Sequence, residues 1–191
     1  RRPPRSTLFP YTTLFRLICA TTSKKGSVQS VRLLDLRKQP AFAFNGKMSF
    51  SDGKEGGSGQ LAWQKTSEEI QVVLKAPLSK KSWTLTESAQ QASIKISTGE
   101  HYYSQSAADL LSNQIGWLVP WAGLQSWVIG QPTQNGQLEW DDDGQGYLLV
   151  DQGWVIQYSK LEPYGSAVLP HKIIARKEPY SIKLSIKSWQ W

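Results

Sequence analysis

The chain has 191 residues and a mass of 21.5 kDa, a length typical of one domain, and it contains one cysteine and two histidines. A single cysteine excludes a disulfide framework, and two isolated histidines argue against a histidine-based metal centre. The net charge of +7 arises in the first 40 residues, which hold nine of the 22 basic residues and one of the 15 acidic ones. Because the remaining residues carry no excess of cations, we expect no nucleic-acid partner, and nothing in the sequence indicates a metal or another cofactor.

The amino-terminal segment divides into two parts. Residues 1–16 have no periodicity and resemble translated sequencing-adaptor sequence, so we interpret them as an assembly artefact. Residues 17–40 are polar and basic and include Cys19. A leucine two positions before a lone cysteine resembles the end of a bacterial lipoprotein signal, although Ile18 stands where a small residue is usual. The segment is therefore either a lipid-anchor site with a polar linker or a tail with an incidental cysteine.

From Ala41 onward apolar and polar residues alternate, which predicts antiparallel strands with one apolar face. The Gly/Ser-rich stretch 51–59 is expected to be a turn, and the alternation stops near Ile96 and resumes at Tyr147. The residues that share the apolar phase include Phe42, Phe44, Met48, Phe50, Leu61, Trp63, Ile70, Val72, Leu74, Trp83, Leu85, Ile94, Leu149, Trp154, Ile156, Tyr158, Ile173, Ile182, Leu184 and Ile186.

Between the two blocks the period becomes helical. Ser106 followed by Asp109 is a capping box, and two short amphipathic helices are expected near 106–115 and 120–129. These helices must bury their apolar stripes, and the concave face of the sheet is the available surface. Residues 41–191 are thus predicted to form a single, mainly β domain: a half-open antiparallel β-barrel with a short-helix lid over an apolar cavity.

Several short motifs occur in a fixed order along residues 41–191. This order resembles that of the LolB family of outer-membrane lipoprotein receptors, with one departure at Ser79, where glycine is usual. The motifs are Asn45-Gly46-Lys47-Met48, Leu61-Ala62-Trp63-Gln64, Ala76-Pro77-Leu78, Gly116-Trp117-Leu118-Val119-Pro120, the stretch from Leu124 to Pro132, the stretch from Gly153 to Tyr158, and Leu169-Pro170.

The resemblance implies a non-enzymatic protein that accepts lipoproteins from the periplasmic carrier LolA through an apolar acyl-chain cavity. It would insert them into the inner leaflet of the outer membrane, to which Cys19 would attach it by a lipid, facing the periplasm as a monomer. Pro77 and Leu78 would form a membrane-insertion loop, whereas the residues alone favour an ordinary turn. The expected acyl-cavity residues, which an ordinary core would also explain, are Trp63, Leu74, Trp83, Leu85, Leu111, Trp117, Leu118, Trp127, Trp154 and Tyr158.

Other functions find less support in the sequence. Asp141-Asp142-Asp143-Gly144 resembles the start of a calcium loop but lacks the downstream glutamate. His101 and His171 lie in different blocks, and His171 is expected at the surface. Two alternatives remain: a soluble carrier of the LolA type, which would need no anchor, and a carbohydrate-binding β-module, suggested by the nine tryptophans.

Overall fold

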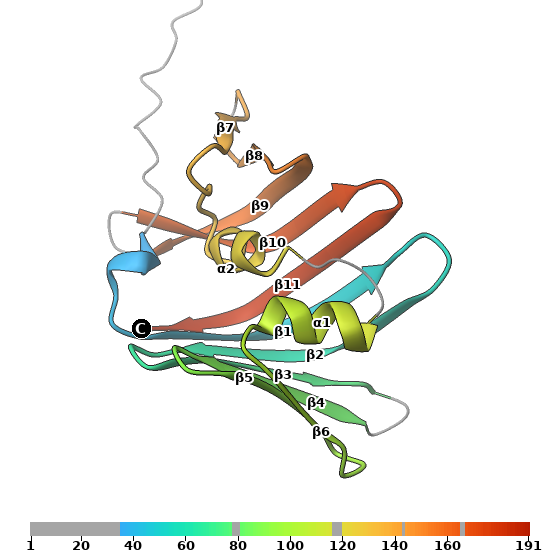
Figure 1. The fold of residues 1–191 in the computed structure, drawn as a ribbon. Helices are drawn as coiled ribbons and strands as arrows, with labels where there is room; N and C mark the ends of the chain where they lie inside the picture. The colour runs from blue at the N-terminus through green and yellow to red at the C-terminus, as the bar shows by residue number, and fades with distance from the viewer. Residues whose placement is uncertain (1–34, 78–80, 116–119, 143, 165–166) are drawn as a thin grey trace, which may run out of the picture.

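The computed structural model describes residues 35–77, 81–115, 120–142, 144–164 and 167–191 (Figure 1). Four of the predicted site residues, Cys19, Leu78, Trp117 and Leu118, lie outside these ranges, as do Ser79, Asp143 and most of the predicted linker.

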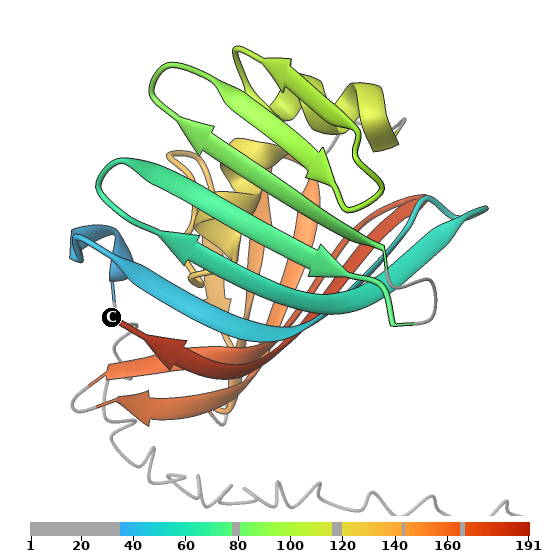
Figure 2. The same ribbon diagram turned by 90° about the horizontal axis from the view of Figure 1, so that it is seen from below.

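In the described part of the chain, eleven antiparallel strands form one sheet in the order β6-β5-β4-β3-β2-β1-β11-β10-β9-β8-β7. Strands that follow one another in the chain are neighbours in the sheet, except that β6 and β7 lie at its two edges and β1 pairs with β11 at its centre. The sheet curls around the helices without joining its two edge strands, β6 and β7 (Figures 1 and 2). The predicted half-open barrel is confirmed. The strands are β1 (Phe42–Ser51), β2 (Gly56–Lys65), β3 (Glu69–Lys75), β4 (Ser82–Ser88), β5 (Ala92–Ile96), β6 (His101–Ser104), β7 (Gln137–Trp140), β8 (Gly146–Asp151), β9 (Trp154–Tyr164), β10 (Ala167–Lys177) and β11 (Tyr180–Gln190).

The turn predicted at residues 51–59 is shorter in the structure. The chain reverses over residues 52–55, and β2 already begins at Gly56. Glycines usually weaken a strand, but a side chain at Gly59 would not fit, because its Cβ would lie 2.6 Å from the Lys75 carbonyl oxygen on β3. Gly59 therefore allows close strand packing, whereas Gly53, with a φ of 91°, lies in the turn.

The central pair of strands contains an irregularity at Gly46. The register of β1 against β11 shifts between Asn45 and Gly46. A Cβ on Gly46 would lie 2.2 Å from the Ser185 carbonyl oxygen, so a larger residue would force the two backbones apart.

The described residues also form three helical segments: the 3-10 turn η1 (Leu36–Lys38), α1 (Ala107–Ile115) and α2 (Trp121–Trp127). Ser106 caps α1 as predicted, since its hydroxyl accepts the Asp109 N–H at 3.2 Å; the hydroxyl also donates to the Asp109 carboxylate at 2.7 Å. Both α-helices lie within the hollow of the sheet (Figure 1). Together they are called the helical lid below.

Aromatic rings connect the centre of the sheet to the lid. The ring centroids of Trp189 and Phe44 are 4.9 Å apart, those of Phe44 and Trp63 5.8 Å, and those of Trp63 and Trp121 5.4 Å. This row runs from β11 through β1 and β2 to α2. All four side chains are buried, so α2 packs on the same core that holds the two central strands together.

His171 is not the surface residue that the sequence suggested. It is buried within β10. Its Nδ1 lies 3.0 Å from the Ile186 carbonyl oxygen, and its Nε2 lies 3.0 Å from the Tyr164 hydroxyl and 3.3 Å from the Glu162 carboxylate. The imidazole is buried because each of its ring nitrogens has a partner.

Candidate functional site

The concave face of the sheet and the helical lid enclose a cavity of about 380 Å³. Its volume lies within the range of small-molecule binding pockets. Six of the residues predicted to line an acyl cavity do line it: Trp63, Leu74, Trp83, Leu85, Leu111 and Trp127. Further apolar residues outside the predicted set also line the cavity, among them Met48, Phe50, Val72, Ile96, Trp121 and Leu124. Most of these share the strand or helix phase of the predicted set, and that phase is the signal that could have identified them.

Trp154 and Tyr158 share the apolar phase but do not line the cavity. They pack against the end of α2, where the Trp154 and Trp127 ring centroids are 5.6 Å apart. The Tyr158 ring stacks on Tyr147 at 4.3 Å, and its hydroxyl donates to the Trp127 carbonyl oxygen at 2.9 Å. These two residues therefore support the lid.

The cavity wall is almost free of polar side chains. Gln114 and Ser58 contribute the only side-chain amide and hydroxyl among the described lining residues, and none of those residues is charged. The buried Trp63 indole N–H has no hydrogen-bond acceptor within the described part of the chain. Such a surface favours an apolar ligand, because a charged or strongly polar one would lose its hydration without compensation.

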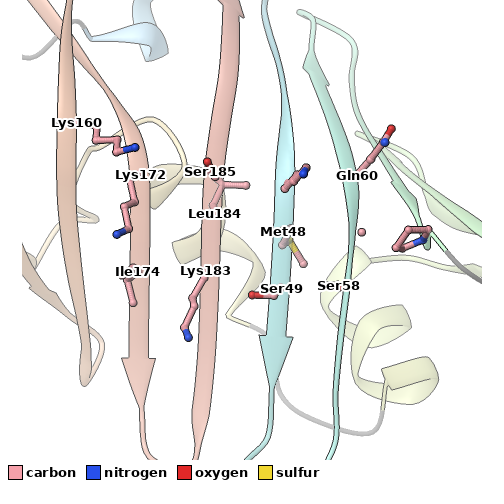
Figure 3. Close-up of a pocket in the computed structure, with 13 residues that line it drawn as sticks. Met48, Ser49, Ser58, Gln60, Lys160, Lys172, Ile174, Lys183, Leu184 and Ser185 are labelled. Carbon is pink, nitrogen blue, oxygen red and sulfur yellow. The ribbon is translucent and has the colours of Figure 1, made fainter.

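A second hollow, of about 490 Å³, lies on the opposite face of the sheet (Figure 3). It is lined by side chains of β1, β2, β9, β10 and β11 and by Pro77, and lysines are prominent among them. Met48, Ser58 and Leu184 contribute to both hollows, so only the sheet itself separates the two.

One carboxylate attaches the lid to the β4 side of the half-barrel. Glu87 on β4 accepts the Ala107 backbone N–H at 3.0 Å, the Gln125 amide N–H at 3.1 Å and the indole N–H of Trp121. The first donor stands at the start of α1, where an acidic group is favoured, and the other two are on α2. Glu87, a half-buried residue of the sheet, therefore holds both helices.

The other end of α2 is attached to β8 and β9 by buried groups. Asp151 accepts the Trp127 indole N–H at 2.9 Å and both the backbone N–H (2.8 Å) and the hydroxyl (2.5 Å) of Thr133. Burial raises the pKa of the Asp151 carboxyl, but the hydrogen bonds from Thr133 and Trp127 outweigh this effect and hold the pKa below its ordinary value. Tyr147 adds a hydrogen bond to the Gly130 carbonyl oxygen at 3.2 Å. This end of the lid is thus bound more extensively than the Glu87 end.

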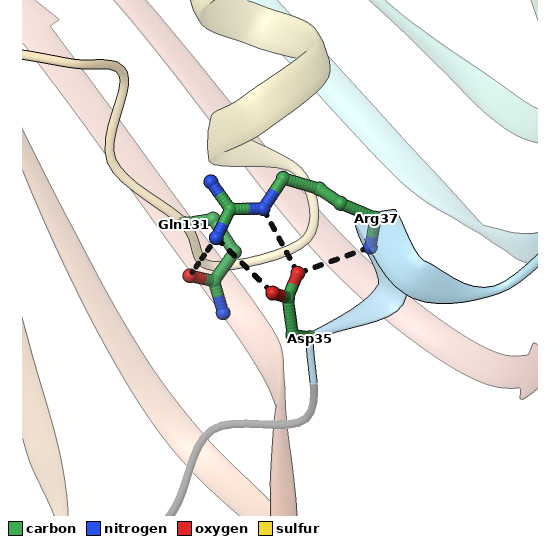
Figure 4. Close-up of polar contacts among 3 residues, drawn as sticks. All are labelled: Asp35, Arg37 and Gln131. Atoms are coloured by element: carbon green, nitrogen blue, oxygen red, sulfur yellow. Dashed lines mark hydrogen bonds and ion pairs between the residues drawn. The ribbon is translucent and has the colours of Figure 1, made fainter.

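The start of the described chain also contacts this region (Figure 4). Leu36 is completely buried, and Arg37 forms an ion pair with Asp35 at 2.9 Å. The hydrogen bond from Arg37 lowers the pKa of the Asp35 carboxyl. Arg37 Nη2 lies 3.4 Å from the Gln131 side-chain oxygen, just after α2. The last part of the predicted linker is therefore connected to the loop that follows α2.

Pro77 is exposed and follows β3 directly. Lys75 and Lys81 flank the three residues that lie outside the description, Leu78 among them. Within the described ranges no helix is long and apolar enough to cross a membrane, and no group of acidic, histidine or cysteine side chains could hold a metal ion.

Comparison with known proteins agrees with the family resemblance. A family model described as "Outer membrane lipoprotein LolB" matches residues 40–189. The outer-membrane lipoprotein LolB of Xylella fastidiosa is 29% identical over 165 residues, covering 85% of this chain and 76% of the relative. That of Pseudomonas fluorescens is 31% identical over 147 residues, covering 76% and 72%. Among solved structures, a LolA superfamily protein from Nitrosomonas europaea has a TM-score of 0.45 at 12% identity, covering 85% of this chain and 89% of that one. Since the family model spans most of the sequence and both LolB relatives cover more than two thirds of it, the chain belongs to the LolB family of outer-membrane lipoproteins.

Proposed function

We propose that this protein is an outer-membrane lipoprotein receptor that holds the acyl chain of a lipoprotein in the cavity beneath the helical lid. The observation that carries the proposal is the cavity itself, which is large enough for a ligand, apolar and free of charged lining residues among those described. Membership of the LolB family supports the same role.

The physical reason for such a cavity is the cost of exposing an acyl chain to water. Each methylene group gains about 0.8 kcal/mol when it leaves water, so a long chain is transferred between apolar sites instead of being released. A receptor must bind the chain more tightly than the donor does and less tightly than the bilayer does. No bond is made or broken in this transfer, and the chemistry needs no metal or nucleotide.

The finer steps of the proposal concern the partners and the membrane. A carrier of the LolA type would deliver the lipoprotein, and the loop containing Pro77 and Leu78 would contact the inner leaflet during insertion. A lipid on Cys19 would keep the protein, acting as a monomer, on the outer membrane and facing the periplasm. Two acyl chains on that lipid would give stable attachment, whereas one chain would be marginal.

The cavity is tested by filling it. Val72 lines the cavity, and its neighbour Val73 lies on the opposite face of β3 because side chains alternate along a strand. Val72→Trp should abolish saturable binding of a fluorescent fatty-acyl probe to the full chain. The matched variant Val73→Trp adds the same ring outside the cavity and should bind the probe as the parent does.

Circular dichroism and urea unfolding would establish that both variants fold. If overpacking unfolds Val72→Trp, Leu124→Gln provides a second variant, since it places an uncompensated amide in the wall of the cavity. Parental affinity in folded Val72→Trp and in Leu124→Gln would refute the assignment of this cavity to the acyl chain.

A further inference from the structure

The hollow on the outer face of the sheet contains an unusual concentration of lysines. Its thirteen lining residues include Lys47, Lys160, Lys172 and Lys183 but no acidic residue (Figure 3). We refer to this site as the basic groove. Lys47, Lys172 and Lys183 are exposed, as is Lys160, which points toward Lys172 in Figure 3. The described residues provide none of the four with an ion-pair partner.

The strand register places these cations side by side. One row across the sheet consists of Gln60, Lys47, Ser185, Lys172 and Ser159, and the adjoining row of Ser58, Ser49, Lys183, Ile174 and Gln157. Lys47 and Lys172 thus flank one serine, at roughly 10 Å from each other, since neighbouring strands are about 4.8 Å apart. Lys183 lies two residues along β11 from that serine, on the same face.

Such an arrangement has a cost when nothing is bound. Like charges on neighbouring strands repel, and no acidic side chain in the groove compensates them. Lys160 also adopts a φ of 55°, which is unfavourable for a residue other than glycine. An anion placed over Ser185 would remove the repulsion. It could accept hydrogen bonds from the lysine ammonium groups, from the hydroxyls of Ser49 and Ser185, and from the Gln60 amide.

We propose that the basic groove binds the headgroups of anionic phospholipids, so that the outer face of β1, β10 and β11 lies against the membrane. Pro77 forms part of the groove wall, and in the sequence it directly precedes Leu78, the residue proposed to enter the membrane. The half-buried side chain of Ile174 supplies an apolar contact of the kind that a lipid offers and a soluble acidic peptide does not require. The inference rests on the proposed function only in taking a membrane as the partner.

The test compares two double variants that remove the same charge. Lys172→Gln/Lys183→Gln changes the groove, whereas Lys54→Gln/Lys95→Gln changes exposed lysines of the β1–β2 turn and of β5 that do not line it. Binding of the full chain to vesicles of phosphatidylcholine with phosphatidylglycerol is measured by flotation. Basic residues that precede Asp35 attract such vesicles equally in both proteins. The groove variant should bind about 30-fold more weakly than the control variant, and this difference should shrink at high salt. Vesicles of phosphatidylcholine alone should show no difference.

Two further measurements separate the outcomes. Both double variants should bind the fatty-acyl probe with the affinity of the parent protein. If the acyl-cavity proposal is wrong, the parent protein itself will fail to bind the probe, and the comparison of vesicle binding will still test the basic groove. The groove variant should resist urea at least as well as the parent, because it relieves repulsion. Equal weakening of vesicle binding in both double variants would overturn the proposal. A groove-dependent preference for poly-glutamate over anionic vesicles would overturn it too, in favour of an acidic protein partner.

Discussion

Replacing Glu87 by glutamine should loosen the helical lid without unfolding the sheet. The carboxylate accepts three N–H groups, one from Ala107 and two from the side chains of Trp121 and Gln125. A glutamine of the same shape has one acceptor oxygen, and its NH₂ group would face donors instead of acceptors. At least one donor of the lid would then lose its partner.

The magnitude follows from the number of bonds and their exposure. A hydrogen bond to a charged group contributes about 1.5–3 kcal/mol, but Glu87 is half-buried and water can replace part of the loss. We expect Glu87→Gln to reduce the free energy of lid opening by about 1–2 kcal/mol, which raises the open population roughly 5- to 30-fold.

Hydrogen exchange measured by mass spectrometry would locate the effect. Amides in α1 and in α2 should exchange faster by that factor, whereas those of β1 and β11 should remain unchanged. Entry of a fluorescent acyl probe should accelerate in parallel. Glu69→Gln is the matched control, since it removes the same charge from an exposed residue of β3. Unchanged exchange in the helices, or equal acceleration in helices and sheet, would refute the assignment of Glu87 as the attachment of the lid.

Three further predictions concern the other end of the lid, the centre of the sheet and the membrane loop. Asp151→Asn should lower the free energy of unfolding by about 1–3 kcal/mol at neutral pH. The folded-state pKa of Asp151 lies below its ordinary value of 3.8, so the ionised carboxylate stabilises the fold above pH 3.8, and this stabilisation is lost as the pH falls through the folded-state pKa. The difference between parent and variant in urea unfolding should therefore disappear in acid. A difference that does not depend on pH would contradict this account. Gly46→Ala should destabilise the fold by roughly 1–3 kcal/mol, because its Cβ would meet the Ser185 carbonyl oxygen, whereas Ser49→Ala on the same strand should have little effect in the same assay. Leu78→Glu should leave acyl-probe binding intact but slow delivery of a loaded lipoprotein to liposomes. Delivery at the parental rate would mean that the loop has no role in membrane insertion.

The alternation of apolar residues was sufficient to predict the half-barrel and most of its strands, because one face of each strand must be buried. It did not predict β6 (His101–Ser104) or β7 (Gln137–Trp140), which are four-residue edge strands with little apolar alternation. Periodicity also could not separate cavity from core, since Trp154 has the same phase as Trp63 yet packs behind the end of α2.

Glu87 was missed for a different reason. It is a polar residue in a strand, and its three donors lie 20 to 38 residues further along the chain. No local pattern records such a contact. His171 was misplaced in the same way, because the groups that allow its burial come from β11 and from the far end of β9.

The adjacency of β1 and β11 has a consequence for how the molecule forms. The strands β1 to β6 and β7 to β11 form two meanders, each of which can grow by pairing neighbours in sequence. The joint between them pairs Phe44 with Trp189, so it requires contact between residues at opposite ends of the domain and the closure of a very long loop. Contacts of such high sequence separation slow folding, and the cavity floor that contains Met48 and Leu184 is complete only after this joint has formed. A nascent chain that lacks β11 would therefore hold two separate half-sheets and no enclosed cavity, and the apolar interior would be complete only once β11 has paired with β1.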